Sequence, residues 1–293
     1  MPETLRLAAD ALAEAGVDSS RHDAEVILAW VLGIPRSALQ SAHVLDAAQA
    51  RAFTAALDRR IAREPLQHIT GVAGFRYLDL EVGPGVFVPR PETEVMAGAA
   101  VQELERLARA GVDHPRAVDL CTGSGAVAVA MASEVPTAVV TAVELSPEAY
   151  AYAVRNARDV LVDVRLGDIA DAVDDLRERV HVVTANPPYI PLTAFETVAP
   201  EARDFDPPVA LWSGEDGLDM IRAVAVVAAR LLVDGGLVVC EHADTQGEAA
   251  RELFAGAGLW VQVRDHHDLA GRSRFVSARR APRHQGPAGT IAL

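Results

Sequence analysis

DLCTGSGAVAVA, residues 119–130, joins the end of an apolar strand to a loop with two glycines and then to a run of small residues. RAVDL at 116–120 predicts a buried strand, and GAVAVAMASE at 125–134 predicts a helix. Gly123 and Gly125 let the backbone turn sharply and let a ligand approach it closely. This order of strand, glycine loop and helix is typical of an open α/β sheet, whose ligands collect at the carboxyl ends of its strands.

Strand and helix patterns alternate from this stretch almost to the end of the chain. Further strands are predicted at 139–144, 163–166, 181–185, 235–241, 259–265 and 273–280. Helices are predicted between them at 147–160, 169–179, 217–232 and 247–258. Such alternation predicts a seven-stranded, mostly parallel, doubly wound (Rossmann-like) α/β sheet. The last two strands have only a short connection, so the final strand is expected to be antiparallel.

The rest of the chain predicts other kinds of structure. We expect a helical bundle at 1–70, a β-hairpin linker at 71–90, the sheet domain at 91–281 and a flexible tail at 282–293. Within the linker, apolar residues up to Val82 predict one strand, Gly83-Pro84-Gly85 a turn, and 86–88 the return strand.

Composition excludes several classes of protein. No apolar run reaches the roughly 20 residues of a membrane span, and the start lacks the basic region of a signal peptide, so the cytoplasm is the expected location. A formal net charge of −14 argues against direct, sequence-independent nucleic-acid binding. Two cysteines, Cys121 and Cys240, make neither a disulfide framework nor a structural zinc site, and no metal is expected. The chain has no lysine, which excludes Walker A and Schiff-base chemistry.

Two further strand ends carry polar side chains that suit a bound nucleoside. Glu144 closes its strand about 20 residues past the glycines and can accept both ribose hydroxyls of NAD or of an adenosyl ligand. Asp168 can accept from an adenine amino group with Ile169 against the ring, or can simply cap the next helix. The glycine loop also satisfies the G-x-G-x-x-A form of the dinucleotide fingerprint, so NAD stays open at this point.

The fourth strand end is TANPPYIP, residues 184–191, in which Asn186 directly follows the predicted strand 181–185. The two prolines stop the strand and stiffen the chain. The motif has no nucleophile and no metal ligand, but the Asn186 side chain and the Pro187 carbonyl are two fixed acceptors, with Tyr189 as a flat wall. Two such acceptors suit the two N–H bonds of a planar NH₂ group. A nitrogen of this kind is a poor nucleophile, so it needs a strong electrophile such as a methyl sulfonium, and catalysis would be mostly positioning.

Taken together, these motifs resemble S-adenosylmethionine-dependent methyltransferases of the Asn-Pro-Pro-Tyr class. More narrowly, the chain resembles the protein-(glutamine-N5) methyltransferases that modify class-1 peptide release factors. The resemblance covers almost the whole chain and rests on PLQHITG at 65–71, GVFVPRPETE at 85–94, DLCTGSGA at 119–126, NPPYIP at 186–191, EARDFDPPVAL at 201–211, GEDGLD at 214–219 and DLAGRSRFV at 268–276.

The resemblance implies a methyltransferase domain behind a helical domain that docks the substrate. It implies methyl transfer from S-adenosylmethionine to the glutamine amide of a Gly-Gly-Gln loop, leaving S-adenosylhomocysteine. The implied cofactor-binding residues are Cys121, Thr122, Gly123, Ser124, Gly125, Glu144, Asp168, Ile169 and Asn186. The implied substrate-binding residues are Asn186, Pro187, Pro188, Tyr189, Phe87 and Arg90, of which Asn186, Pro187 and Tyr189 would act in catalysis.

The chain departs from the family pattern at Cys121, where glycine is usual, and in the polar stretch EHADTQG at 241–247. We interpret His242 as a surface residue rather than a base, and His266-His267 as a solvated turn. Three alternatives stay open: the same chemistry on another protein glutamine or on a nucleic-acid base, a nicotinamide-dependent oxidoreductase, and a non-catalytic binding protein. The last two leave the Asn-Pro-Pro-Tyr motif without a role.

Overall fold

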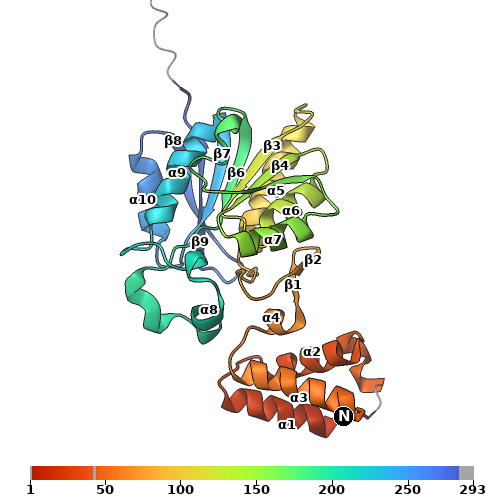
Figure 1. The fold of residues 1–293 in the computed structure, drawn as a ribbon. Helices are drawn as coiled ribbons and strands as arrows, with labels where there is room; N and C mark the ends of the chain where they lie inside the picture. Colours follow the sequence, from red (N-terminus) through yellow and green to blue (C-terminus); the bar gives the residue numbers. More distant parts are fainter. Residues whose placement is uncertain (1, 42–43, 284–293) are drawn as a thin grey trace, which may run out of the picture. The chain divides into compact units, whose positions relative to one another are not determined.

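The computed structural model describes residues 2–41 and 44–283 (Figure 1). They form two compact units. The N-terminal unit comprises Met1–Ala73, Glu81–Val88 and Glu196–Pro207, and the sheet unit comprises Gly74–Leu80, Pro89–Phe195 and Pro208–Leu293. From residue 284 on, the tail expected at 282–293 lies outside the described residues.

The N-terminal unit is helical. Its elements are α1 (Pro2–Glu14), α2 (Ser20–Leu32), the 3-10 helix η1 (Arg36–Ser41), α3 (Ala47–Ile61), α4 (Leu66–Thr70) and α8 (Pro200–Phe205). Asp46 caps α3 in a capping box with Gln49, and Gly33 ends α2 in the left-handed conformation. Apolar residues at helical spacing, such as Leu12, Ile27 and Phe53, form the core of this unit.

The sheet unit contains a seven-stranded sheet in the order β5-β4-β3-β6-β7-β9-β8 among the described residues. The strands are β3 (Arg116–Leu120), β4 (Val139–Glu144), β5 (Val162–Leu166), β6 (Val180–Ala185), β7 (Leu232–Glu241), β8 (Trp260–His267) and β9 (Ser273–Arg280). Strands β3 to β7 pair in parallel, and β9 is antiparallel to both of its neighbours. The expected doubly wound, mostly parallel sheet is therefore confirmed.

Helices cover both faces of this sheet (Figure 1). They are α5 (Thr93–Arg109), α6 (Ala126–Glu134), α7 (Pro147–Asn156), α9 (Asp219–Leu231) and α10 (Gly247–Gly256). The short 3-10 helices η2 (Asp174–Leu176), η3 (Leu192–Thr197) and η4 (Pro208–Ala210) lie in the connections between these elements. Successive strand residues enter opposite cores: Val182 packs with α5 and α6, and Val183 packs with α9 and α10. Burial on both faces explains why these strands read as continuous apolar runs.

The helix expected at 169–179 does not form. The segment is a series of turns followed by η2. Asp168 receives the backbone N–H of Ala170 on its side chain, at 2.8 Å, and that of Ala172 on its carbonyl, at 2.9 Å. Further along, the Asp175 carboxylate accepts a hydrogen bond from Arg165, which lies outside the segment. Local Asp hydrogen bonds compete with a helix ladder, and here they prevail.

The hairpin lies earlier in the chain than the sequence indicated. Strands β1 (Val72–Phe75) and β2 (Leu78–Glu81) pair, and the expected return strand at 86–88 is irregular backbone. The turn falls at Arg76, whose φ of +54° is left-handed. The Arg76 backbone N–H donates to Glu94 Oε1 at 3.0 Å, which stabilises a turn that the sequence alone does not signal.

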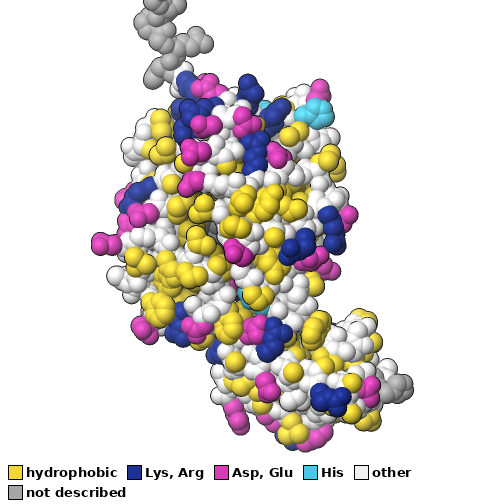
Figure 2. All heavy atoms as spheres, viewed as in Figure 1, with side chains coloured by type: hydrophobic (Ala, Val, Ile, Leu, Met, Phe, Trp, Pro, Cys, Tyr) yellow, Lys and Arg dark blue, Asp and Glu magenta, His cyan; other side chains and the backbone are white. Residues whose placement is uncertain are grey.

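No helix within residues 2–41 and 44–283 is both long and apolar enough to cross a membrane. On the face shown in Figure 2, arginine and acidic side chains are interspersed, and neither sign of charge dominates.

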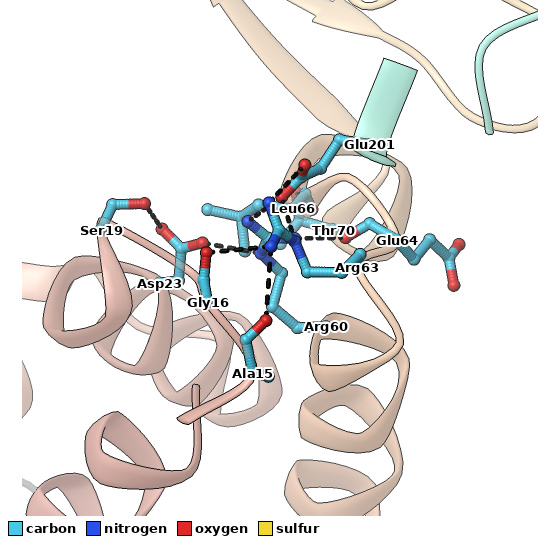
Figure 3. A network of polar contacts seen from close by, with 10 residues as sticks. All are labelled: Ala15, Gly16, Ser19, Asp23, Arg60, Arg63, Glu64, Leu66, Thr70 and Glu201. Carbon is cyan, nitrogen blue, oxygen red and sulfur yellow. Dashed lines mark hydrogen bonds and ion pairs between the residues drawn. The ribbon is translucent and has the colours of Figure 1, made fainter. Parts of the chain in front are cut away.

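A network of buried charges holds α8 to the N-terminal helices (Figure 3). Arg60 Nε donates to Asp23 Oδ2 at 2.7 Å, and its Nη2 donates to Glu201 Oε1 at 3.0 Å. Arg63 binds both oxygens of Glu201, each at 2.7 Å, in a bidentate pair. The Arg60 and Asp23 side chains are only 7% and 4% exposed, so water has little access to replace the hydrogen bond between them if one partner is removed.

We expect Asp23→Ala to lower the free energy of unfolding of the N-terminal unit by about 3 kcal/mol, because it leaves the Arg60 charge buried without this partner. Glu25→Ala is the matched control, since Glu25 pairs with the exposed Arg21; we expect it to cost less than about 1 kcal/mol. Denaturant unfolding followed by circular dichroism measures both. Equal effects of the two substitutions would contradict a stabilising role for the buried pair.

Candidate active site

The parallel register brings the strand ends to one edge of the sheet. Leu120 of β3 pairs with Val143 on one side and with Ala185 on the other, and Ala185 pairs in turn with Cys240 of β7. The residues that follow β3, β4, β6 and β7 therefore lie at neighbouring positions along the edge where ligands of such sheets bind.

The glycine loop after β3 has the open backbone that the sequence indicated. Gly123 has a φ of +58°, and a Cβ built on it would meet no atom within 4 Å, so one side of the loop is clear. Gly125, at φ +84°, caps α6, and a Cβ there would lie 3.3 Å from the Ala153 Cα. Gly123 thus leaves room for a ligand, whereas Gly125 allows close packing of α6 on α7.

Cys121 also adopts a left-handed conformation, with a φ of +58°. This conformation costs a non-glycine residue roughly 1–2 kcal/mol, which gives a physical reason for glycine being usual at this position. Burial, and secondarily the charge of Glu144, raises the pKa of the Cys121 thiol well above its usual value. The thiol is therefore neutral and acts here as a small apolar group.

Glu144 lies beside the glycine loop, as its position at the end of β4 predicted. Its Oε2 accepts from the Gly123 N–H at 2.7 Å, and its Oε1 accepts from the Ser146 N–H at 2.9 Å. The residue is only 9% exposed. Each carboxylate oxygen has a further lone pair, so Glu144 can hold the loop and still accept ligand hydroxyls.

Asp119 binds the same loop through Thr122. It was not identified from the sequence as a residue of the site. It is 2% exposed, and its two oxygens accept from Thr122 Oγ1 at 2.5 Å and Thr184 Oγ1 at 2.6 Å. Burial raises the pKa of Asp119 to about 6, although both hydroxyls oppose the shift. Its place one residue before the end of β3, ahead of a glycine loop, was the signal that could have identified it.

Asp168 and Ile169 face different surroundings. Asp168 is exposed at the end of β5 and caps the turn that follows, through Ala170. Ile169 is 6% exposed and packs in the core with Val173 and Leu176. The two alternatives for Asp168, adenine acceptor and cap, are compatible, because its Oδ1 makes the capping bond and its Oδ2 adds further acceptor capacity.

The Asn-Pro-Pro-Tyr stretch leaves β6 at the same edge. Asn186 is half-buried, and its Nδ2 donates to Thr93 Oγ1 at 3.2 Å. Pro187 is buried, whereas Pro188 and Tyr189 are half-buried. The Tyr189 hydroxyl donates to Glu241 Oε1 at 3.3 Å. Burial and the Glu241 charge raise the pKa of Tyr189, so its hydroxyl stays protonated.

Distant residues hold this stretch in place. Gln246 Nε2 donates to the Tyr189 carbonyl at 2.9 Å and to the Asp216 carbonyl at 3.2 Å. Gly217, at φ +76°, lies so close to the Asn-Pro-Pro-Tyr stretch that a Cβ on it would be 2.3 Å from the carbonyl oxygen of Tyr189. The GEDGLD stretch thus needs a glycine at 217 because the backbone after Asn186 lies against it.

Phe87 and Arg90 precede α5 in the sequence. Arg90 belongs to the sheet unit, and its positive charge works against the rise in the pKa of Tyr189. Phe87 is half-buried and belongs to the N-terminal unit, where the neighbouring Val86 carbonyl contacts His68 Nε2 at 3.2 Å.

Glu241 is a second carboxylate that the sequence did not single out. It closes β7 and is 1% exposed. Burial raises the pKa of Glu241 to about 7, against the opposing effects of Thr93, Arg274 and Tyr189. The signal that could have identified it is the same as for Glu144, an acidic residue at the carboxyl end of a parallel strand.

The interpretation of His242 as a surface residue was wrong. Its side chain is fully buried, with Nε2 3.0 Å from Asp265 Oδ1 and Nδ1 2.9 Å from the Ala243 carbonyl. His266-His267 is not a solvated turn but part of β8, where His266 stacks on Phe275 with ring centres 4.6 Å apart. Within residues 2–41 and 44–283 no group of three His, Cys, Asp or Glu side chains is arranged to hold a metal.

Comparison with known proteins identifies both parts of the chain. Residues 3–71 match the family described as the PrmC N-terminal domain, and residues 80–199 match the methyltransferase small domain.

Relatives extend over nearly the whole chain. A release factor glutamine methyltransferase of Streptomyces coelicolor is 53% identical over 270 residues, which cover 92% of this chain and 94% of that protein. The protein of that name in Mycolicibacterium smegmatis is 44% identical over 93% of this chain and 95% of its own. A 4-amino-L-phenylalanine/4-methylamino-L-phenylalanine methyltransferase of Streptomyces pristinaespiralis is 46% identical over 69% of each chain. The chain belongs to the release factor glutamine methyltransferase family.

Proposed function

We propose that this protein transfers a methyl group from S-adenosylmethionine to the side-chain amide nitrogen of the glutamine in the Gly-Gly-Gln loop of class-1 release factors. Family membership supports the reaction and the substrate. The single observation that carries the proposal is the register of β3, β6 and β7, which sets Asn186 on the same sheet edge as the glycine loop. The formal charge of −14 supports a protein partner rather than a nucleic acid, and the cytoplasm is the compartment in which this substrate is expected.

We assign the cofactor to the loop 121–125 and to the ends of β4 and β5. The clear side of Gly123 and the N-terminus of α6 suit the carboxylate of the methionyl group. Glu144 suits the two ribose hydroxyls, and Asp168 suits the adenine amino group, with Ile169 beside it. When bound, S-adenosylmethionine supplies the methyl group on a sulfonium and leaves as S-adenosylhomocysteine.

The chain's own contribution to catalysis is the holding of a weak nucleophile. The Asn186 Oδ1 and the Pro187 carbonyl accept one hydrogen each from the substrate carboxamide. Two acceptors on one NH₂ group raise the electron density on its nitrogen and aim that nitrogen at the methyl carbon. Tyr189 packs against the plane of the carboxamide, and the proton released after transfer passes to water. Positioning of this kind removes much of the barrier without a protein nucleophile or strong base.

Mass spectrometry tests the assignment directly. A release factor is incubated with the protein and isotopically labelled S-adenosylmethionine, and the labelled peptide is sequenced. The expected result is one labelled methyl group on the glutamine of the Gly-Gly-Gln loop. A label on another residue, or no label on any release factor, would overturn the proposed substrate.

Asn186→Ala should leave cofactor binding intact and reduce kcat by about a hundredfold or more, the scale of one lost catalytic hydrogen bond. Gln102→Ala is the matched control, because it removes an exposed carboxamide from α5. Single-turnover methylation of the release factor measures kcat, and calorimetry measures cofactor binding. Near-wild-type turnover in the Asn186 variant would remove this side chain from the mechanism.

Glu144→Ala should weaken S-adenosylmethionine binding by about 1–3 kcal/mol, the value of a hydrogen bond to a charged group. Glu148→Ala, in the first turn of α7 and exposed to solvent, should leave the dissociation constant within about twofold. Isothermal titration gives both values. A dissociation constant unchanged by Glu144→Ala would exclude this residue from the cofactor site.

We further propose that the helical N-terminal residues dock the release factor. A chain that begins at residue 71 should bind S-adenosylmethionine as the full chain does but show a raised KM for intact release factor. It should methylate a short Gly-Gly-Gln peptide at an unchanged rate, which separates docking from chemistry. Methylation of intact release factor at the full-length rate would refute this role.

A further inference from the structure

The polar stretch EHADTQG at 241–247, where the chain departs from the family pattern, ends with a glutamine that binds the Asn-Pro-Pro-Tyr stretch. Gln246 is the N-cap residue of α10 and is 8% exposed. Its Nε2 donates to the Tyr189 carbonyl at 2.9 Å and to the Asp216 carbonyl at 3.2 Å. Its Oε1 accepts from the Ala243 backbone N–H at 2.9 Å.

These three hydrogen bonds determine which way the Gln246 amide is turned. A backbone N–H only donates and a backbone carbonyl only accepts. The amide oxygen therefore faces Ala243, and the NH₂ group faces the carbonyls of Tyr189 and Asp216, with one hydrogen for each. The reversed amide would place its oxygen against two carbonyl oxygens. Gln246 thus holds the Tyr189 carbonyl in a single arrangement.

The Ala243 peptide that orients Gln246 is itself held by a chain of polar side chains. Its carbonyl accepts from the Gln246 backbone N–H at 2.9 Å and lies 2.9 Å from His242 Nδ1. His242 Nε2 lies 3.0 Å from Asp265 Oδ1, and Asp265 Oδ2 accepts from Ser273 Oγ at 2.6 Å. Both ring nitrogens of the fully buried His242 face oxygen atoms, and a doubly protonated imidazole satisfies both.

The start of α10 packs tightly on this chain of side chains. A Cβ built on Gly247 would lie 2.1 Å from Ser273 Oγ and 2.9 Å from Asp265 Oδ2. No side chain fits between α10 and the two strands β8 and β9 at this point. The backbone that carries Gln246 is therefore restrained from both sides, by Ala243 and by the strands.

We propose that Gln246 is a positioning residue for methyl transfer, and that His242, paired with Asp265, acts on the reaction through it. By holding the Tyr189 carbonyl, Gln246 restrains both the Tyr189 ring and the backbone that presents the Pro187 carbonyl two residues earlier. The inference rests on the proposed function, because it explains how the groups that contact the substrate carboxamide are kept in place.

Gln246→Glu tests the role of the two donated hydrogen bonds. The change keeps the shape and the oxygen that accepts from Ala243, but it sets a second oxygen against two carbonyl oxygens. We expect kcat on release factor to fall about a hundredfold, the effect of misplacing a reacting group by about 1 Å. The KM for release factor should stay within about twofold, because docking does not depend on this alignment. Gln262→Glu, the same change on an exposed residue of β8, is the matched control and should keep kcat within about twofold.

Gln246→Met separates positioning from a folding defect caused by a buried charge. This neutral side chain keeps the length but donates nothing, and we expect kcat to fall about tenfold. Calorimetry with S-adenosylmethionine counts the folded sites in each variant, and kcat is expressed per site. Wild-type kcat in both variants, a raised KM at unchanged kcat, or loss of cofactor binding in both variants would overturn the inference.

A double-mutant cycle tests whether His242 acts through Gln246. In His242→Gln a side-chain nitrogen can replace Nε2 but nothing replaces Nδ1, so we expect kcat to fall about tenfold. Combined with Gln246→Met, it should cause less than about twofold further loss, because both changes release the same restraint. Fully additive losses would overturn the role of His242. If the wild type methylates no glutamine, the proposed function fails and takes the inference with it, whereas an active wild type with fully active Gln246 variants refutes the inference alone.

Discussion

The parallel register of β3, β4, β6 and β7 is the constraint on which the candidate active site depends. Its parts come from residues far apart in the sequence, and only parallel pairing brings their strand ends to one edge. Parallel pairing in turn requires cover on both faces of the sheet. The alternation of Val182 and Val183 between two apolar cores, one under α5 and α6 and one under α9 and α10, provides that cover.

Two buried acids lie beneath this edge and act in the same way. Asp119 and Glu241 are each almost fully buried, and burial raises the pKa of the first to about 6 and of the second to about 7. Each acid is bound by hydroxyl groups of neighbouring elements, Thr122 and Thr184 in one case and Tyr189 in the other. A polar group buried at this cost restrains its neighbours, because they lose a hydrogen bond when they move. The glycine loop and the strand end after β6 are both restrained in this way.

The sequence was sufficient for the sheet and for the residues at the strand ends, because both follow from periodicity and from one rule about parallel sheets. The prediction of secondary structure failed where local hydrogen bonds compete with the conformation that the apolar spacing or the glycine turn indicated. Asp168 turns the chain at 168–172, so the apolar spacing at 169–179 gives no helix, and the left-handed Arg76 closes the hairpin before the glycine turn. Thr93 was not identified and His242 was wrongly interpreted as a surface residue, because the contacts of both depend on partners that only the tertiary structure supplies.

The Asn-Pro-Pro-Tyr stretch acquires its rigidity from the chain that follows it as much as from its prolines. After Tyr189 the chain pairs through Ile190, whose N–H donates to the Leu211 carbonyl at 2.9 Å and whose carbonyl accepts from Ser213 at 2.9 Å. The segment between Ile190 and Leu211 includes Glu196–Pro207, which belongs to the N-terminal unit. Backbone hydrogen bonds therefore join the two ends of this segment. They keep the Asn-Pro-Pro-Tyr stretch before it in place. Gly217 and Gln246 add a second restraint on the Tyr189 carbonyl, which explains why a distant GEDGLD stretch accompanies the Asn-Pro-Pro-Tyr motif in one chain.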